Sequence, residues 1–190
     1  MSSPRKVDLL TEQEYLAGEE CSDVRHEYID GHVFAMSVAG ERHNRIALNI
    51  AFRLRAAARG SRCGVFISDM KLYIRDRRIY YYPDVMLTCD DSDADALYKE
   101  RPCLVAEVLS NSTEAIDRRE KFAIYQTIPS LRYILLIRTN YANVEYYCRN
   151  NLGEWETGLL EGDELLGIEC GACRTDLGLL HVYEDVIFPD

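Results

Sequence analysis

The sequence predicts one α/β domain with a mixed central sheet flanked by helices, and three observations support this fold class. The chain has 190 residues, enough for one domain with a substantial core. Hydrophobic residues make up 47% and charged residues 28%, as in an ordinary soluble globular protein. Helical periodicity and short extended runs follow one another without a repeat, linker or low-complexity segment. We therefore treat residues 1–190 as a single α+β domain with extra β hairpins at both ends.

The first elements are two helices with a hairpin between them. Thr11 and Glu14 form a capping box, which predicts a short helix from about residue 12. Residues 24–36 are typical of a hairpin with its tight turn at residues 30–31, an Asp-Gly pair. The clearest helix covers residues 41–59, where apolar side chains recur at spacing four before Gly60.

The remaining elements build the sheet. Extended runs at residues 63–67, 71–74 and 79–87 precede an acidic loop at 90–96. Residues 103–109 are apolar except for Glu107, which is typical of a strand covered on both faces. A helix is expected from Ser112 or Thr113 to about residue 126, with Pro129 beyond its end. Strands at 133–137 and 143–148 and an irregular, strand-like tail from Trp155 complete the chain.

Compartment and cysteine content favour a cytoplasmic protein. The N-terminal residues contain no apolar run of a signal peptide, and no stretch approaches the ~20 apolar residues of a membrane helix. Seven scattered cysteines without a secretion signal indicate reduced thiols. The CxxC pair Cys170 and Cys173 allows a zinc or redox site. The alternative is two unrelated cysteines near a turn, because no second ligand pair has zinc spacing.

The charge of the chain is uneven. The net charge is −10, which argues against strong non-specific binding to nucleic acid. Residues 151–190 alone carry a net −9, so residues 1–150 are close to neutral. Residues 42–64 hold six arginines, one histidine and no acid. A cationic surface is therefore expected in the first half of the chain, and a nucleic-acid partner is not excluded.

Two carboxylates interrupt apolar strands. Asp84 follows Pro83 within YYYPDVML, and Glu107 lies within CLVAEVLS. Burying a lone carboxylate costs several kcal/mol unless it is paired or bound to a metal. Two of them in neighbouring strands would suit a hard cation such as Mg²⁺, which takes one or two carboxylates and keeps several waters. The alternative is that each pairs with an arginine.

The helix after Glu107 offers a lysine at the level of this pair. Asp117, Lys121 and Tyr125 lie at i, i+4 and i+8, on one helix face. The strand beyond Glu107 covers about 13 Å and the helix back to Lys121 about 12 Å, at ~3.3 Å and ~1.5 Å per residue. If the helix folds back along the strand, the ammonium of Lys121 lies near Glu107, where it could orient an attacking water or offset the charge of a phosphate. A solvated Asp117–Lys121 pair is the alternative.

These residues together resemble a known family. A Pro-Asp pair, the run EVLSNST that begins at Glu107 and a downstream D-x-x-x-K-x-x-x-Y are similar to the Uma-type restriction endonucleases of bacteria. That family belongs to the PD-(D/E)XK nucleases. The resemblance extends to HEYIDG, GERHN and YILLI, and covers roughly residues 8–185. It implies a restriction-endonuclease-like core and Mg²⁺, which Mn²⁺ can replace, bound by Asp84 and Glu107. The carbonyl of Val108 is a candidate further ligand.

The sequence departs from the parent nuclease pattern at one position. Leu109 stands where the E-x-K lysine belongs, and the resemblance implies that Lys121 on the following helix takes its place. Lys71, within Asp69-Met70-Lys71, is an alternative, but it precedes the Pro-Asp pair and so has the wrong order.

Glu27 and three residues of the long helix are further site candidates. Glu27 shares a strand face with Ile29 and would support the site from the side, unless it pairs with Arg25 or a helix arginine. His43 could reach a phosphate or a metal-bound water, or make a hydrogen bond at the helix N-terminus.

Two interpretations also remain open for the arginines at the start of the long helix and for the tyrosines at 80–82. Arg42 and Arg45 are candidates for backbone phosphates or for solvated side chains. Tyr80, Tyr81 and Tyr82 could stack on bases, but alternating strand residues more often pack in a core.

The function that these residues predict is Mg²⁺-dependent phosphodiester hydrolysis, with DNA as the expected substrate. Asp84 and Glu107 would hold the metal, Lys121 would orient the water and Glu27 would assist. Specificity is expected to come from loops or from a homodimer, since no appended recognition domain is visible. The alternative is a non-catalytic protein with the nuclease fold and a binding or regulatory role, which the net charge and the displaced lysine would favour.

Overall fold

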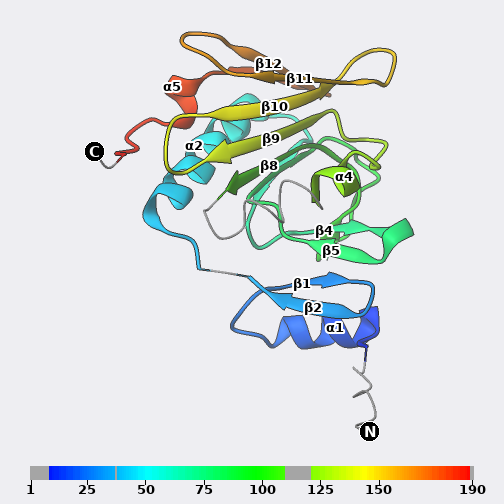
Figure 1. Ribbon diagram of the computed structural model, residues 1–190. Coiled ribbons are helices and arrows are strands. Elements are labelled where there is room, and N and C mark those ends of the chain that lie inside the picture. Colours follow the sequence, from blue (N-terminus) through cyan, green and yellow to red (C-terminus); the bar gives the residue numbers. More distant parts are fainter. Residues whose placement is uncertain (1–8, 37, 110–120, 189–190) are drawn as a thin grey trace, which may run out of the picture.

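Two β-sheets form the framework of the protein in a computed structural model that describes residues 9–36, 38–109 and 121–188 (Figure 1). The larger sheet has the strand order β11-β10-β9-β8-β6-β3, and its β8–β9 pair is parallel while the other pairs are antiparallel. This mixed sheet confirms the predicted fold class. Its strands are β3 (Gly64–Ile67), β6 (Val85–Thr88), β8 (Pro102–Leu109), β9 (Tyr133–Arg138), β10 (Val144–Arg149) and β11 (Trp155–Leu159).

The second sheet has the order β2-β1-β5-β4-β7. Its hairpin β1–β2 turns at Asp30 and Gly31, both with positive φ, as the Asp-Gly signal predicts. A separate hairpin, β12–β13, lies at the opposite end of the molecule (Figure 1), so the two extra hairpins are also confirmed. The strands are β1 (His26–Ile29), β2 (His32–Ala35), β4 (Lys71–Ile74), β5 (Ile79–Tyr81), β7 (Tyr98–Lys99), β12 (Leu166–Cys170) and β13 (Cys173–Leu177).

The described helices are α1 (Glu12–Glu20), α2 (Glu41–Ala57), α4 (Phe122–Tyr125), α5 (Leu179–Val182) and the 3₁₀ turn η1 (Arg75–Arg77). The expected capping box is present on α1, where Thr11 and Glu14 bond reciprocally. The helix expected over residues 112–126 is described only at its end, because residues 110–120 lie outside the described residues. None of the described helices has the length and apolar character needed to cross a bilayer.

Strand β8 is the centre of the core, and it is covered on both faces as expected. Leu104, Ala106 and Val108 belong to the cluster that α2 completes with its apolar face. Val105 and Leu109 belong to a second cluster, which contains residues of α4 and of β9. Full burial of a Val or Leu side chain stabilises by about 1.5–3 kcal/mol, so the two clusters fix the position of β8 from both sides. A side chain on β8 is therefore held by a rigid backbone.

The prediction of one continuous strand over residues 79–87 is wrong. The chain forms β5 in one sheet, leaves it at Tyr82-Pro83-Asp84, and then forms β6 in the other sheet. Proline has no N–H to donate to a ladder, so an interruption at Pro83 is physically reasonable. As a result, Asp84 lies where the chain passes from one sheet to the other.

The three tyrosines at 80–82 are core residues, with exposures of 2%, 1% and 1%, so the base-stacking alternative finds no support in the fold. Tyr80 packs in an aromatic cluster with Tyr15, Tyr28 and Tyr73 between α1 and the second sheet.

The expectation of reduced thiols throughout is wrong for four of the seven cysteines. Disulfides join Cys63 to Cys89 and Cys103 to Cys170. The sequence could not show this, because the partners come from distant segments that only the sheet brings together. The CxxC pair is not a unit either, since Cys170 is bonded to Cys103 while Cys173 is a buried free thiol. Among the described residues no group of three or more His, Cys, Asp or Glu is arranged to hold a metal.

Candidate active site

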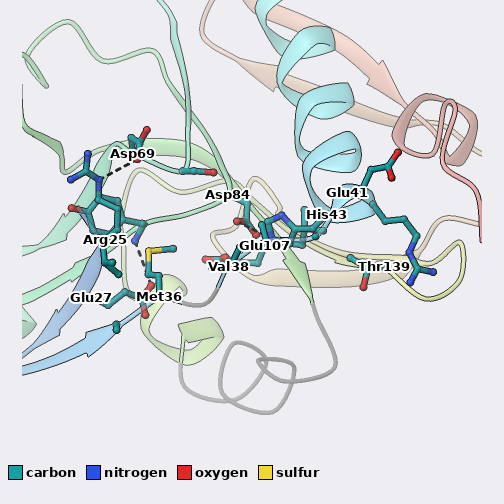
Figure 2. A pocket seen from close by; sticks show the side chains of 18 of the residues that line it. Arg25, Glu27, Met36, Val38, Glu41, His43, Asp69, Asp84, Glu107 and Thr139 are labelled. Atoms are coloured by element: carbon teal, nitrogen blue, oxygen red, sulfur yellow. Dashed lines mark hydrogen bonds and ion pairs between the residues drawn. The ribbon is translucent and has the colours of Figure 1, made fainter. Parts of the chain in front are cut away.

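The candidate site is a pocket of about 1060 Å³ where α2 begins, between the β1–β2 hairpin and the larger sheet. Figure 2 shows Asp84, Glu107 and His43 close together inside it, with the first turn of α2 above them. The labelled side chains of Arg25, Glu27 and Met36, from the hairpin and its ends, lie to the left of this group in the same view.

Asp84 and Glu107 are brought to the same level by sheet pairing. Val85 of β6 faces Ala106 of β8 in the antiparallel register, so one step further along each strand places Asp84 opposite Glu107. Both are buried, with exposures of 8% and 3%. The two carboxylates of the predicted metal pair therefore lie opposite each other, Glu107 within β8 and Asp84 at the residue that precedes β6.

Asp84 is oriented through both of its carboxylate oxygens. Its Oδ2 accepts a hydrogen bond of 2.7 Å from the backbone N–H of Val108. Its Oδ1 lies 3.2 Å from His43 Nε2, on the first turn of α2. His43 therefore contacts one of the candidate metal ligands, and its reach to a phosphate or a metal-bound water stays a prediction. The carbonyl of Val108 as a metal ligand stays a prediction.

Glu107 is oriented by a residue to which the sequence assigned no role. The hydroxyl of Tyr125 donates to Glu107 Oε1, and Tyr125 is fully buried. Burial, together with the negative charge of Glu107, raises the pKa of Tyr125 well above its usual value, so the hydroxyl remains a donor. Tyr125 shares the predicted face of Asp117 and Lys121, and this spacing is the signal that could have found it.

Lys121 lies between two carboxylates. Its Nζ is 2.7 Å from Glu27 Oε1 and 3.9 Å from Glu107 Oε1, and it is 5.2 Å from the centroid of the Tyr81 ring. Only 6% of Lys121 is exposed. The distance estimate from the sequence, which returned Lys121 to the level of Glu107, thus agrees with the geometry. Its proposed partner Asp117 lies outside the described residues.

Glu27 pairs with Lys121 at 2.7 Å, a cation that neither alternative named, while Arg25 pairs with Asp69 at 3.2 Å. The backbone N–H of Tyr82 also donates to Glu27 Oε1, at 3.5 Å. The alternative lysine, Lys71, is buried over the Tyr82 ring at 5.5 Å and is not among the described residues that line the pocket.

The two arginines of α2 differ in their surroundings. Arg45 is half exposed and pairs with Glu41 at 2.9 Å, an i,i+4 surface pair worth about 0.3–0.5 kcal/mol. Arg42 lines the pocket, and its Nη1 is buried with no hydrogen-bond partner among the described residues. An unpaired buried donor is costly, so Arg42 is the better placed of the two for an incoming anion.

The electrostatics of the pocket favour a cation. Of the described residues that line it, seven are Asp or Glu and four are Arg or Lys. Such a surface repels a phosphodiester unless positive charge is added. Buried carboxylates such as Asp84 and Glu107 are stabilised by an ion that accepts oxygen ligands.

Comparison with known proteins agrees with this arrangement of residues. Residues 12–170 match the model of the Uma2 family, described as "Putative restriction endonuclease". The chain belongs to this family. The match covers every described candidate residue of the site and confirms the resemblance found in the sequence motifs.

Two curated relatives of this Uma2 chain are uncharacterised proteins of the cyanobacterium Synechocystis sp. One is 37% identical over 147 residues, which is 77% of each chain. The other is 34% identical over 158 residues, which is 82% of this chain and 89% of the relative. A crystal structure described as a putative nuclease belonging to DUF820, from Anabaena variabilis, has the same fold. It superposes with a TM-score of 0.74 over 94% of this chain and 99% of that one, at 15% identity.

Proposed function

We propose that this Uma2-family protein is a metal-dependent endonuclease that hydrolyses phosphodiester bonds, with DNA as substrate and Mg²⁺ or Mn²⁺ as the ion. One observation carries the proposal: two buried carboxylates from neighbouring strands and a buried lysine meet in one pocket, within a restriction endonuclease family. The nucleic-acid substrate is inferred from the family.

The donor set fits the ion. Asp84 and Glu107 supply carboxylate oxygens, and Mg²⁺ commonly takes one or two carboxylates while it keeps several waters. Two protein ligands are consistent with the finding that no group of three ligands exists among the described residues. When bound, the ion would lower the pKa of a coordinated water and offset the charge of the phosphate.

The protein's own residues would act around that ion. Asp84 and Glu107 are fixed in position by Val108 N–H and by the Tyr125 hydroxyl, so little reorganisation is needed. The ammonium of Lys121 would hold the attacking water and donate to a phosphate oxygen. Glu27 would keep that ammonium in place, because its carboxylate lies 2.7 Å from the Lys121 Nζ.

The first turn of α2 would receive the substrate. Arg42 and His43 line the pocket beside Asp84, and Arg45 is one turn further along the helix. We assign the arginines to phosphate contacts and His43 to the hydrogen bond that orients Asp84. Asp117, a further candidate contact, is outside the described residues.

Two measurements on the same variants test the proposal. Calorimetric titration with Mn²⁺ should show binding that is lost in Asp84→Asn and in Glu107→Gln, and cleavage of plasmid DNA with Mg²⁺ should be lost with it. Asp69→Asn is the matched control, since Asp69 is an exposed acid of the same pocket and should bind and cleave like the wild type.

Other outcomes separate the alternatives. Unchanged Mn²⁺ binding in both variants would remove the site assignment. A wild type that binds nucleic acid but cleaves neither DNA nor RNA with either ion would replace the enzyme by the non-catalytic alternative. A homodimer and a cytoplasmic location remain predictions, which sedimentation and fractionation would test.

A further inference from the structure

Four cysteines gather at the end of the sheet remote from Glu107. Cys63 precedes β3, Cys89 follows β6, and Cys103 is the second residue of β8, so three neighbouring strands contribute one cysteine each. The fourth, Cys170, ends β12 in the separate hairpin. The fold therefore places side by side residues that lie up to 107 positions apart in the sequence.

The two disulfides of this group are in contact. Cys89 Sγ lies 2.9 Å from the carbonyl oxygen of Cys170, and Cys63 Sγ lies 3.7 Å from the same oxygen. The approach is close enough to require glycine at the next position. A Cβ on Gly171, whose φ is +56°, would come within 2.9 Å of Cys89 Cβ. The outer bond, Cys63–Cys89, thus lies against the backbone of Cys170, one of the two residues of the inner bond, Cys103–Cys170.

The two bonds differ in their access to solvent. Cys63 and Cys89 are partly exposed, whereas Cys103 and Cys170 are buried, with exposures of 9% and 0%. A second pocket, of about 380 Å³, is lined by one cysteine of each bond, Cys89 and Cys103, together with Arg101 and Ser130. A thiol from solvent can therefore reach the outer bond first, and Cys89 is the residue placed to pass the exchange inward.

We propose that this cluster is a thiol–disulfide exchange site whose reactant is a small dithiol. A thiolate of the dithiol attacks Cys63 Sγ, the Cys63–Cys89 bond breaks, and its electron pair leaves on Cys89. The Cys89 thiolate then attacks Cys170 Sγ, the Cys103–Cys170 bond breaks, and Cys103 leaves as a thiolate that takes a proton.

The second sulfur of the dithiol completes the reaction. It attacks the first dithiol sulfur in the mixed disulfide and releases Cys63 as a thiol. The dithiol then leaves as a cyclic disulfide. The reactant is oxidised by two electrons, and the protein exchanges two disulfides for one, Cys89–Cys170.

The direction of the inner step follows from burial and charge. A thiolate left on Cys170 would be fully buried, whereas one left on Cys103 faces the second pocket and the guanidinium of Arg101. That guanidinium is 3.1 Å from Asp90, so its charge is shared and only partly offsets a thiolate. The product would tether the β12–β13 hairpin to the end of β6 instead of β8.

Two serine variants test the transfer, because each leaves one cysteine of the outer bond as a thiol. In Cys63→Ser the free residue is Cys89. Alkylation and peptide mapping without reductant should then show loss of the Cys103–Cys170 crosslink, a new Cys89–Cys170 crosslink and label on Cys103. In the matched Cys89→Ser variant the free residue is Cys63, and the native Cys103–Cys170 crosslink should remain.

A second measurement keeps the proposal falsifiable if a variant does not fold. The wild type, treated with limiting dithiothreitol and trapped with acid, should contain the Cys89–Cys170 species before all four thiols appear. The proposal is overturned if native Cys103–Cys170 is the sole remaining crosslink in both experiments. It is overturned equally if the native mass of the untreated protein shows four thiols holding a zinc ion.

Discussion

The two ends of strand β8 are held in place by different kinds of interaction. At one end Glu107 is held by the Tyr125 hydroxyl and faces Lys121, all within the core. At the other end Cys103 is tied covalently to the β12–β13 hairpin. The charged groups that would bind a ligand are held by reversible contacts, while the Cys103–Cys170 bond lies four residues away along the same strand. Stability and site chemistry can therefore be altered separately in this protein.

The largest effect is expected at the covalent end. On the loop-entropy estimate, each disulfide stabilises a protein of this kind by ~4 kcal/mol, given loops of 26 and 67 residues. The double variant Cys103→Ala with Cys170→Ala should lose about that free energy of unfolding, measured by urea denaturation at equilibrium. Cys148→Ala, a partly buried free thiol, is the control and should lose far less. Equal losses in the two proteins would show that the inner disulfide contributes nothing.

Removing the ammonium of Lys121 should act on rate and not on metal affinity. Loss of one preorganised stabilising group lowers the rate by ~10²–10³. Lys121→Gln alone removes the described ion-pair partner of Glu27, a partly buried carboxylate, which destabilises folding. The double variant Lys121→Gln with Glu27→Gln removes both charges, so it should fold, bind Mn²⁺ and cleave slowly. Cleavage at the wild-type rate would disprove the role of the migrated lysine.

Tyr125→Phe should have a smaller effect at the same end. A hydrogen bond to a charged group contributes about 1.5–3 kcal/mol, and its loss frees Glu107 to change orientation. Mn²⁺ affinity should fall by about tenfold to a hundredfold, since each 1.4 kcal/mol is a factor of about ten. Tyr28→Phe is the control, because it removes the hydroxyl of another buried tyrosine, one that donates to the carbonyl oxygen of Leu10 at 2.9 Å. A metal affinity that is unchanged in Tyr125→Phe would mean that Glu107 needs no such support.

The smallest effect is expected for Arg42 of α2, on the salt dependence of DNA binding. Each phosphate that a protein ceases to neutralise reduces the salt slope of its DNA binding by about 1. Arg42→Gln should therefore lower the slope by about that amount, whereas Arg55→Gln, an exposed arginine on the last turn of α2, should not. The slope is measured from affinities at several salt concentrations, with Ca²⁺ in place of Mg²⁺. A slope that both variants leave unchanged would place the DNA elsewhere.

Local sequence signals determined much of the fold. The capping box at Thr11, the Asp-Gly turn at residue 30 and the apolar repeat from Ile46 each specify an element through nearest neighbours alone, and all three elements are present. The site pair was visible for the same reason, since Asp84 and Glu107 break apolar runs in the printed sequence.

Tertiary structure alone decided which strands and which distant side chains pair with each other. Pro83 divides one apolar run between two sheets, and no local signal says which strands each half will join. Glu27 pairs with Lys121 and Cys103 with Cys170 across 94 and 67 positions. Such pairings depend on where buried surfaces bring distant segments together. The free energy that fixes them belongs to the whole core, and a short stretch of sequence does not contain it.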